Sequence, residues 1–294
     1  MKIKKFAAID IGTNAIRVLI SNIIETKDGI HFQKNSLVRA PIRLGEDSFT
    51  LGEISKKSLK RLINAMKAFK LLMKVHGVSH YKAYATSALR EANNSRDVVE
   101  QVKKKSGIKI EIIDGRKEAE IISNSMISEF LNIQKTLLFV DVGGGSTEFT
   151  FINEGKHICS KSFKIGTVRL INNLVDDRVW DAIKGWIIKN AKPYHKITLM
   201  GSGGNINKLF KLSNIKEGKP LSVIKLNQIF LQLESLSYEG RILKFELNPD
   251  RADVIIPAAK IYLKALEWSG GQKIYVPKFG LSDGMIKYMY KNHR

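Results

Sequence analysis

The sequence has little cysteine and few acidic residues relative to its basic ones. Cys159 is the single cysteine among 294 residues, so no intrachain disulfide can form, and a cytoplasmic protein is the expectation. Asp and Glu number 28 against 49 Lys and Arg, which gives a formal net charge of +21. This excess favours an anionic partner, such as nucleic acid, an anionic membrane, or a phosphorylated molecule or polymer.

Long apolar runs are also missing. Asp10, Asn14 and Arg17 interrupt the apolar N-terminal segment before a signal-peptide core is complete, and no run reaches the roughly 18 residues of a bilayer span. A membrane is therefore not an expected partner. Hydrophobic residues make up 44% and charged residues 26%, which is typical of globular proteins. A chain longer than roughly 250 residues predicts two domains.

Several binding motifs are absent. The P-loop pattern GxxxxGK[ST] does not occur, and Ile206 stands where the dinucleotide fingerprint requires a third glycine. The zinc patterns HExxH and CxxC are missing, and so is the RNA-binding RNP1 signature. P-loop nucleotide binding, zinc chemistry and specific nucleic-acid recognition are not predicted.

The first forty residues predict three consecutive strands. An apolar run ends at Asp10, a GTN turn follows, a β-rich run resumes, and the pair Asp28-Gly29 indicates a hairpin. The layout recurs around LLFVDV, GGGS and TEFTFI, with DIGTN matched by DVGGGST. We interpret this as a weak internal repeat, one copy per domain. The alternation of strands and helices elsewhere predicts the α/β class.

The spacing of apolar residues predicts a helix over 55–75 with Ser55 as its N-cap. Its basic residues lie off the apolar face, and no acidic residue occurs from Lys56 to Lys74. Either this is a solvated helix face, or it is a basic wall near an anionic substrate.

The remaining chain predicts helices at 115 to about 131, across 249–266 and from Ser282 onward. Pro257 is expected to kink or divide the second of these helices. No low-complexity linker occurs, so the domain boundary is expected near the helix at 115–131.

Three glycine-rich turns follow apolar strands. Glycine lets backbone N–H groups converge on phosphate oxygens, and the third turn also runs into a helix start. The predicted phosphate contacts in these turns are Gly12, Thr13, Asn14, Gly143, Gly144, Gly145, Ser146, Gly201, Ser202, Gly203 and Gly204.

Acidic residues accompany two of these turns. Asp10 and Asp141 end their strands, and either they hold the turn itself or they hold Mg²⁺, which prefers one or two carboxylates plus substrate phosphates. Glu148 shares a strand face with Ser146, while Phe149 and Phe151 face the other way. A carboxylate beside a phosphate nest favours a metal or water between them, so Glu148 joins the predicted metal site.

Two further side chains allow more than one interpretation. Glu118 lies in the first turn of the helix that opens in IDGRKEAEII, where an acid also suits the helix dipole, and only this dipole role is expected of Glu120. Arg90 either clamps phosphate or pairs with Glu91 or Asp97. Arg17 is expected to be structural.

Taken together, these strings resemble the exopolyphosphatase/guanosine pentaphosphate phosphohydrolase family. The resemblance runs in order from residue 7 to residue 286, and the strings that carry it are AAIDIGTNAIRVLI, ATSALREANN, IIDGRKEAEII, FVDVGGGSTEF, SFKIGTVRL, GSGGN, RADVIIPAAKIY and FGLSDGMI. DIGTN and DVGGGSTE alone fit the wider actin/Hsp70/sugar-kinase fold, whereas the EA after IIDGRK and the late GLSDG favour the narrower family.

The resemblance implies two ribonuclease-H-like domains of the actin-like ATPase superfold flanking a cleft. We assign 1–117 with 281–294 to the first domain and 118–280 to the second, and expect no C-terminal HD-like domain. It also implies that Glu118 is the catalytic base, that Asp141 and Glu148 organise Mg²⁺ and water, that Arg90 contacts phosphate, and that Gly143 to Ser146 cradle the terminal phosphates.

The expected function is Mg²⁺-dependent release of terminal orthophosphate from linear inorganic polyphosphate. The alternatives are the same reaction on guanosine pentaphosphate, a kinase of the same superfold, and a non-enzymatic polyanion binder. The family likeness also suggests a homodimer.

Overall fold

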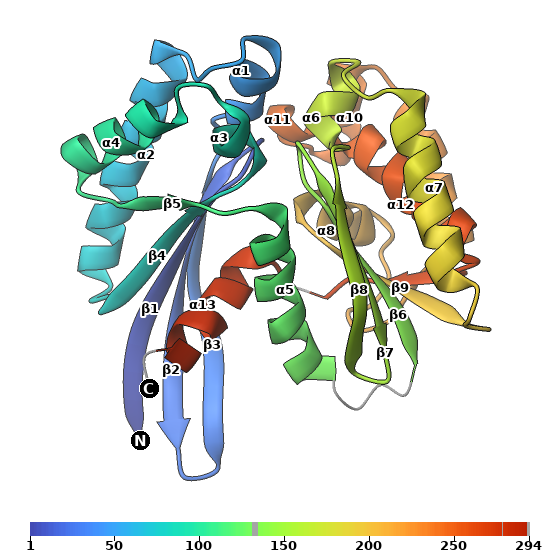
Figure 1. Ribbon diagram of the computed structural model, residues 1–294, viewed down its shortest axis with the longest axis horizontal. Coiled ribbons are helices and arrows are strands. Elements are labelled where there is room, and N and C mark those ends of the chain that lie inside the picture. The colour runs from blue at the N-terminus through green and yellow to red at the C-terminus, as the bar shows by residue number, and fades with distance from the viewer. Residues whose placement is uncertain (131–134, 278, 293–294) are drawn as a thin grey trace. The chain divides into compact units, whose positions relative to one another are not determined.

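The computed structural model describes residues 1–130, 135–277 and 279–292. The chain divides into two compact units: unit 1 comprises Met1–Met126 and Leu281–Arg294, and unit 2 comprises Ile127–Gly280. The division falls inside helix α5 (Gly115–Phe130), which is the segment expected to hold the boundary (Figure 1). Glu118 belongs to unit 1 rather than opening the second domain, and Leu131, the expected helix end, lies outside the described residues.

Unit 1 contains a five-stranded sheet. Its strands are β1 (Lys2–Ile11), β2 (Ile16–Thr26), β3 (Gly29–Ala40), β4 (His80–Ala85) and β5 (Ile110–Ile112). Its helices, besides the first part of α5, are α1 (Leu44–Thr50), α2 (Lys56–Val75), α3 (Ser87–Glu91), α4 (Ser95–Ser106) and α13 (Leu281–Asn292).

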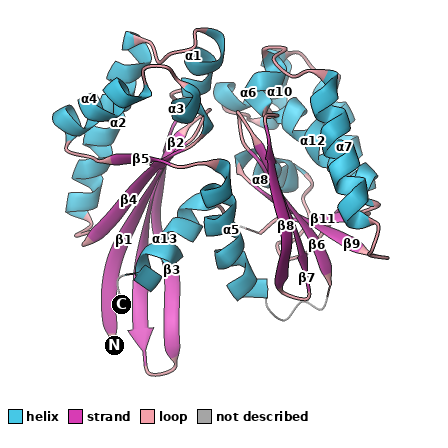
Figure 2. Cartoon of the chain, in the orientation of Figure 1, coloured by secondary structure: helices cyan, strands magenta, loops and turns pink. Residues whose placement is uncertain are grey.

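The strand order in unit 1 is β3-β2-β1-β4-β5 (Figure 2). The first three strands are antiparallel, as predicted, and β4 and β5 run parallel to β1. Thr26 pairs with Gly29, so Lys27 and Asp28 form the hairpin turn. Gly29, with φ of 144°, opens the returning strand in a conformation that favours glycine.

Helices cover both faces of this sheet. On one face, Ile9 and Ile11 of β1 join a core that includes the predicted apolar face of α2, namely Leu59, Leu62, Ile63, Met66, Phe69 and Met73. Ser55 caps α2 by accepting a hydrogen bond from Ser58 N–H, as its position predicted. On the other face, α13 packs on β1, β2 and β4, so the C-terminal segment completes unit 1.

Unit 2 contains a six-stranded sheet. Its strands are β6 (Thr136–Val142), β7 (Thr147–Asn153), β8 (Lys156–Phe163), β9 (Ile197–Ser202), β10 (Leu221–Ser222) and β11 (Lys273–Tyr275). Its helices are α6 (Thr167–Ile171), α7 (Asp177–Ala191), α8 (Gly204–Leu212), α9 (Val223–Glu234), α10 (Tyr238–Phe245), α11 (Pro249–Ala252) and α12 (Ile255–Ser269).

The internal repeat is visible in the two strand orders. The sheet of unit 2 runs β10-β11-β9-β6-β7-β8, with β6, β7 and β8 antiparallel and β9 parallel to β6. Starting from the other edge, the strands β8-β7-β6-β9-β11 take the places of β3-β2-β1-β4-β5 in unit 1, and β10 is added at the far edge. The predicted α/β class and the two-copy architecture are both confirmed by this topology.

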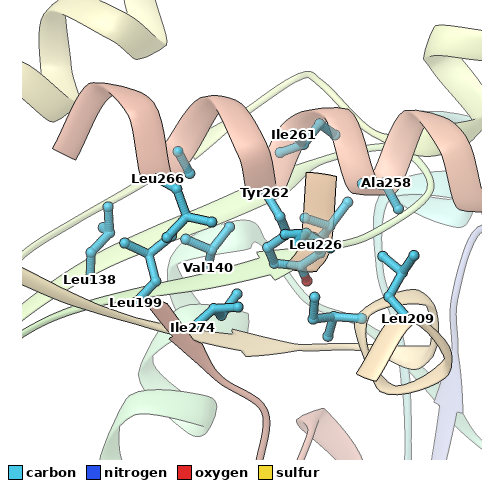
Figure 3. Close-up of a cluster of buried hydrophobic side chains, with 14 of the residues drawn as sticks. Leu138, Val140, Leu199, Leu209, Leu226, Ala258, Ile261, Tyr262, Leu266 and Ile274 are labelled. Atoms are coloured by element: carbon cyan, nitrogen blue, oxygen red, sulfur yellow. The ribbon is translucent and has the colours of Figure 1, made fainter. Parts of the chain in front are cut away.

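The core of unit 2 surrounds α12, which packs on α7, α8, α9 and the sheet. Tyr262 lies fully buried in this core (Figure 3), among side chains that include Val140, Leu199, Leu226 and Leu266. The predicted helix over 249–266 is divided, but at Asp253 and Val254 rather than at Pro257. Pro257 falls in the first turn of α12, where its missing N–H leaves no hydrogen bond unmade.

Gly284 of α13 allows a test of how the C-terminal helix is held. A Cβ at this position would lie 2.8 Å from the carbonyl oxygen of Ile121 in α5, so Gly284→Ala forces two backbones apart. We expect a loss of about 1–3 kcal/mol in the free energy of unfolding, measured by urea denaturation.

The matched control is Gly185→Ala in α7, where nothing lies within 4 Å of the added Cβ. Because alanine favours the helix, this control should gain about 0.5–1 kcal/mol. Equal stability of the two variants would show that Gly284 is not a close-contact position.

Candidate active site

In each unit, the predicted site residues follow parallel strands at their carboxyl ends. In unit 1, β1 leads to the Gly12–Asn14 turn, β4 leads to Arg90 on α3, and β5 leads to Glu118 on α5. In unit 2, β6 leads to the Gly143–Ser146 turn and β9 to Gly203 and Gly204. Carboxyl ends of parallel strands are where α/β folds bind ligands.

Asp10 pairs with a cation on the neighbouring strand. It is directly opposite Arg17 in the β1–β2 register, and Arg17 Nη1 donates to Asp10 Oδ2 at 3.0 Å. Burial raises the pKa of Asp10, and the charge and hydrogen bond of Arg17 only partly oppose this effect. Arg17 is structural in this contact, as expected from the sequence.

The start of α1 holds the Gly12–Asn14 turn. Gly45 N–H donates to the Thr13 carbonyl at 2.9 Å, and Arg43 N–H donates to the Asn14 carbonyl at 3.0 Å. In a planar trans peptide the N–H points opposite to the C=O, so the amides of Asn14 and Ala15 point away from α1. Gly45 allows this approach, because a Cβ there would overlap the Thr13 methyl group.

Arg90 supports the segment that leads to Glu118. Its guanidinium donates to the Ile113 carbonyl at 2.7 Å and to Ser87 Oγ at 3.3 Å. Ile113 N–H in turn donates to the Ala85 carbonyl, which fixes the chain between β5 and α5. These bonds give Arg90 a positioning role, and its phosphate contact stays a prediction.

Glu118 is a buried acid in the first turn of α5. Asp114 caps this helix, since its Oδ1 accepts from Lys117 N–H at 2.7 Å and its carbonyl accepts from Glu118 N–H at 3.0 Å. Lys117 Nζ lies 3.3 Å from Glu120 and 3.1 Å from the Tyr288 hydroxyl, and the bond to Tyr288 contributes most to raising the pKa of Lys117. Glu120 is therefore occupied in an ion pair on α5.

Four polar side chains form a row across the sheet of unit 2. The register places Ser162 opposite Glu148, Glu148 opposite Asp141, and Asp141 opposite Ser202. Glu148 is 2% exposed, and its Oε1 accepts from Ser162 Oγ at 2.8 Å. The neighbouring Phe149 and Phe151 point into the core, as strand alternation predicted.

This row fits a divalent cation. Two carboxylates directly opposite each other are unfavourable unless a proton or a cation lies near them. Ser202 Oγ is buried beside Asp141 and has no hydrogen-bond partner among the described residues, so a further oxygen is available there. The part of the chain that the structure describes holds no group of three or more His, Cys, Asp and Glu suited to a metal, but Mg²⁺ needs only one or two carboxylates plus phosphate.

The Gly143–Ser146 turn is held by the start of α6. Thr167 N–H donates to the Gly143 carbonyl at 3.0 Å, Val168 N–H donates to the Gly144 carbonyl at 2.9 Å, and Arg169 Nε donates to the Gly145 carbonyl at 2.7 Å. The three following amides, of Gly144, Gly145 and Ser146, therefore point away from α6. Converging amides of this kind bind anions.

The third glycine segment has two parts with different surroundings. Strand β9 extends through Ser202, and Gly201 lies against Tyr262 and Ile274, so its glycine serves packing. Gly203 has φ of 110°, which favours glycine, and a Cβ there would lie 3.4 Å from Asp141 Oδ1. Gly204 begins α8, the predicted helix. The phosphate contacts of this segment stay predictions.

Tyr262 stabilises this third glycine segment from the core of unit 2. Its hydroxyl donates to the Ser202 carbonyl at 2.6 Å, and burial, followed by the charge of Asp141, raises its pKa well above its ordinary value. Neither Tyr262 nor the α6 donors were predicted as site residues. The string RLGE, which contains Gly45, is similar to the string KIGT, which contains Gly166. This similarity is the sequence signal that marks the starts of α1 and α6.

These observations define the class: a duplicated α/β protein of the actin-like ATPase superfold, with glycine-rich turns at the carboxyl ends of its parallel strands. A family model, described as the Ppx/GppA phosphatase family, matches residues 23–293. The chain belongs to the Ppx/GppA phosphatase family, which confirms the resemblance read from the motifs.

Curated relatives carry two kinds of names. A bifunctional 3-dehydroquinate synthase/phosphatase of Fusobacterium nucleatum is 29% identical over 92% of this chain and 44% of that protein. Exopolyphosphatase 1 of Mycobacterium bovis is 27% identical over 59% of this chain and 49% of that protein. The chain thus spans about half the length of these relatives. Exopolyphosphatase 2 of Mycobacterium tuberculosis is 25% identical, with 97% and 98% covered.

Solved structures share the fold over the whole chain. An exopolyphosphatase from Cytophaga hutchinsonii has a TM-score of 0.88 at 25% identity, with 98% of each chain covered. A Ppx/GppA family member from Aquifex aeolicus has a TM-score of 0.77 at 26% identity, with 100% of each covered.

The raised pKa of Asp10 predicts a stability effect with a definite sign. The pKa of Asp10 is higher in the folded state than in the unfolded state, so the ionised carboxylate lowers the free energy of unfolding at neutral pH. This loss decreases as the pH falls through the folded-state pKa and is absent below the unfolded-state pKa. Asp10→Asn should therefore keep or increase the free energy of unfolding at pH 7, with no gain at pH 3, by urea denaturation.

Glu25→Gln in the same sheet is the matched control. A hydrogen bond from Lys4 contributes most to lowering the pKa of Glu25, so this variant should show the opposite sign. A large loss of stability in Asp10→Asn at pH 7 would show that Asp10 serves the fold rather than a ligand.

Proposed function

We propose that this protein is an exopolyphosphatase, which releases terminal orthophosphate from linear inorganic polyphosphate. The observation that carries the proposal is the Gly143–Ser146 turn, whose three amides point away from α6 beside two opposed carboxylates. Amides with a neighbouring divalent-cation site suit a terminal phosphate. The names of the mycobacterial relatives support the same substrate.

The proposed step is hydrolysis of a phosphoanhydride. Water attacks the terminal phosphorus, the bond from that phosphorus to the bridging oxygen breaks, and the shortened chain leaves with the bridging oxygen. Glu118 accepts the proton of the attacking water, which yields orthophosphate. Its buried position in the first turn of α5 supports this role, because a catalytic group must be held in a fixed position.

Asp141 and Glu148 are proposed to hold Mg²⁺, with Ser202 as a further oxygen nearby. A divalent cation there supplies neutralisation of the phosphate charge. Asp10 has a different environment, since Arg17 already pairs with its Oδ2, and its metal contact stays a prediction.

Polyphosphate is proposed as the preferred substrate over guanosine pentaphosphate. The net charge of +21 favours the ligand with more charges, because each neutralised phosphate releases counterions. Comparing kcat/KM on the two substrates distinguishes them. A kinase of the same superfold would transfer phosphate to an acceptor instead of releasing it.

Localisation and assembly stay predictions. Within the described ranges, no helix is both long enough and apolar enough to cross a membrane. The cytoplasmic location and the homodimer are proposals that fractionation and light scattering test.

Replacing the proposed base gives the central test. Glu118→Gln should lower kcat for orthophosphate release from polyphosphate by about 10²–10⁴-fold, with little change in KM, because the amide cannot accept the proton. The matched control is Glu120→Gln, two residues along the same helix, which should retain kcat. Absence of release by the wild type, or undiminished release by Glu118→Gln, would falsify the assignment.

The opposed carboxylates predict a metal effect on stability as well as on rate. In EDTA, Glu148→Gln should raise Tm, because it removes one of two facing charges. With Mg²⁺ and phosphate present, the wild type should gain Tm while Glu148→Gln and Asp141→Asn gain less, and both variants should need more Mg²⁺ for half-maximal rate.

The control for this experiment is Glu154→Gln, an exposed acid in the β7–β8 turn. It should respond to Mg²⁺ as the wild type does. If all four proteins show the same Mg²⁺-dependent Tm, the metal does not bind at this row.

A further inference from the structure

A stripe of lysines runs along α2. Residues 54–90 contain no acidic residue, and α2 alone carries six lysines and an arginine, all exposed. At 3.6 residues per turn, five of the lysines fall within about 80° of arc over about 27 Å of helix. We call these five the α2 lysine stripe: Lys56, Lys60, Lys67, Lys70 and Lys74.

One end of this stripe is fixed beside the Gly12–Asn14 turn. Ser55 N–H donates to Asp47 Oδ2 of α1 at 2.9 Å, and Ile54 exchanges two hydrogen bonds with Asn94, both at 2.9 Å. Helix α1 is the element that holds the Thr13 and Asn14 carbonyls. The stripe therefore begins at the substrate end of unit 1.

The other end of the stripe lies at the opposite end of the sheet. Lys5 Nζ, early in β1, donates to the carbonyl of His76 just after α2. Lys70 lies against Gly107, which ends α4, so the stripe meets the Lys103–Lys105 run there. Helices α2 and α4 pack side by side (Figure 1). The lysines thus lie along α2 from the end near the turn to the end of α4.

The stability of helix α2 does not explain why it carries so many lysines. The dipole of a helix favours acids in its first turn, yet α2 begins with Lys56 and Lys57 and has no acid there. The neighbouring α4 follows the usual rule, with Asp97 in its first turn and lysines in its last. Arg61 is excluded from the stripe, because it donates to the Pro41 and Ile42 carbonyls.

We propose that the α2 lysine stripe binds the distal part of a long polyphosphate chain whose terminus is being hydrolysed. This inference rests on the proposed function and extends it: the enzyme prefers long chains, and the preference comes from unit 1. A flexible line of negative charge matches exposed lysines, which bind phosphates as point charges without base-specific contacts. The stripe offers no exposed aromatic residue for base stacking, which favours polyphosphate over single-stranded nucleic acid.

The test variant is Lys60→Gln with Lys67→Gln and Lys74→Gln. Its KM for long-chain polyphosphate should rise about tenfold at moderate salt, and the slope of log KM against log salt should fall by about 2. Hydrolysis of tripolyphosphate should retain its rate. The control has the same charge change on unit 2 and should match the wild type: Lys184→Gln, Lys189→Gln and Lys192→Gln.

Binding is measured separately from catalysis. Fluorescence anisotropy of labelled long-chain polyphosphate is recorded with Glu118→Gln, alone and combined with the three stripe substitutions. If only the combined variant binds polyphosphate more weakly, the inference is supported. If the wild type hydrolyses no polyphosphate, that result refutes the proposed function but not the binding by the stripe. Equal effects of the stripe and control substitutions would overturn the inference, as would tighter binding of single-stranded DNA of equal charge.

Discussion

The bonds between a glycine turn and the following helix start are the constraint on which both units depend. In unit 1, Gly45 and Arg43 bind the turn carbonyls, and in unit 2 Thr167 and Val168 do so. A trans peptide cannot turn its C=O toward the helix without turning the next N–H away from it. The fold therefore directs these amides away from the helix by satisfying the preceding carbonyls, through backbone N–H groups and, at Gly145, through the Arg169 side chain.

This arrangement limits which residues fit behind the turns. Gly166 lies so near Gly144 and Gly145 that a Cβ would overlap their backbones, and a Cβ at Gly45 would overlap the Thr13 side chain. Gly166 itself has an extended backbone with φ of −156°, so close approach requires the glycine rather than a left-handed conformation. The same reason applies to Gly201 beneath Tyr262.

Local patterns predicted what depends on near neighbours in the chain. The Ser55 cap, the apolar face of α2 and the strand alternation at Glu148 follow from spacing alone. The bond from Tyr262 to Ser202 joins residues 60 apart, and the α6 donors lie more than twenty residues beyond their turn, so no spacing rule finds them. The helix break before Pro257 was misplaced because proline is harmless in a first turn.

The two copies differ at the position opposite the strand-ending aspartate, and this difference changes the local charge. The residue opposite the strand-ending aspartate is Arg17 in unit 1 and Glu148 in unit 2. An arginine partly compensates the charge of its aspartate, whereas a second carboxylate raises the local negative charge and favours a cation from solution. One duplicated scaffold thus places a cation opposite the aspartate of one turn and a second acid opposite the aspartate of the other. Because the strand register is common to both, the side chain at this position sets the local charge beside each aspartate.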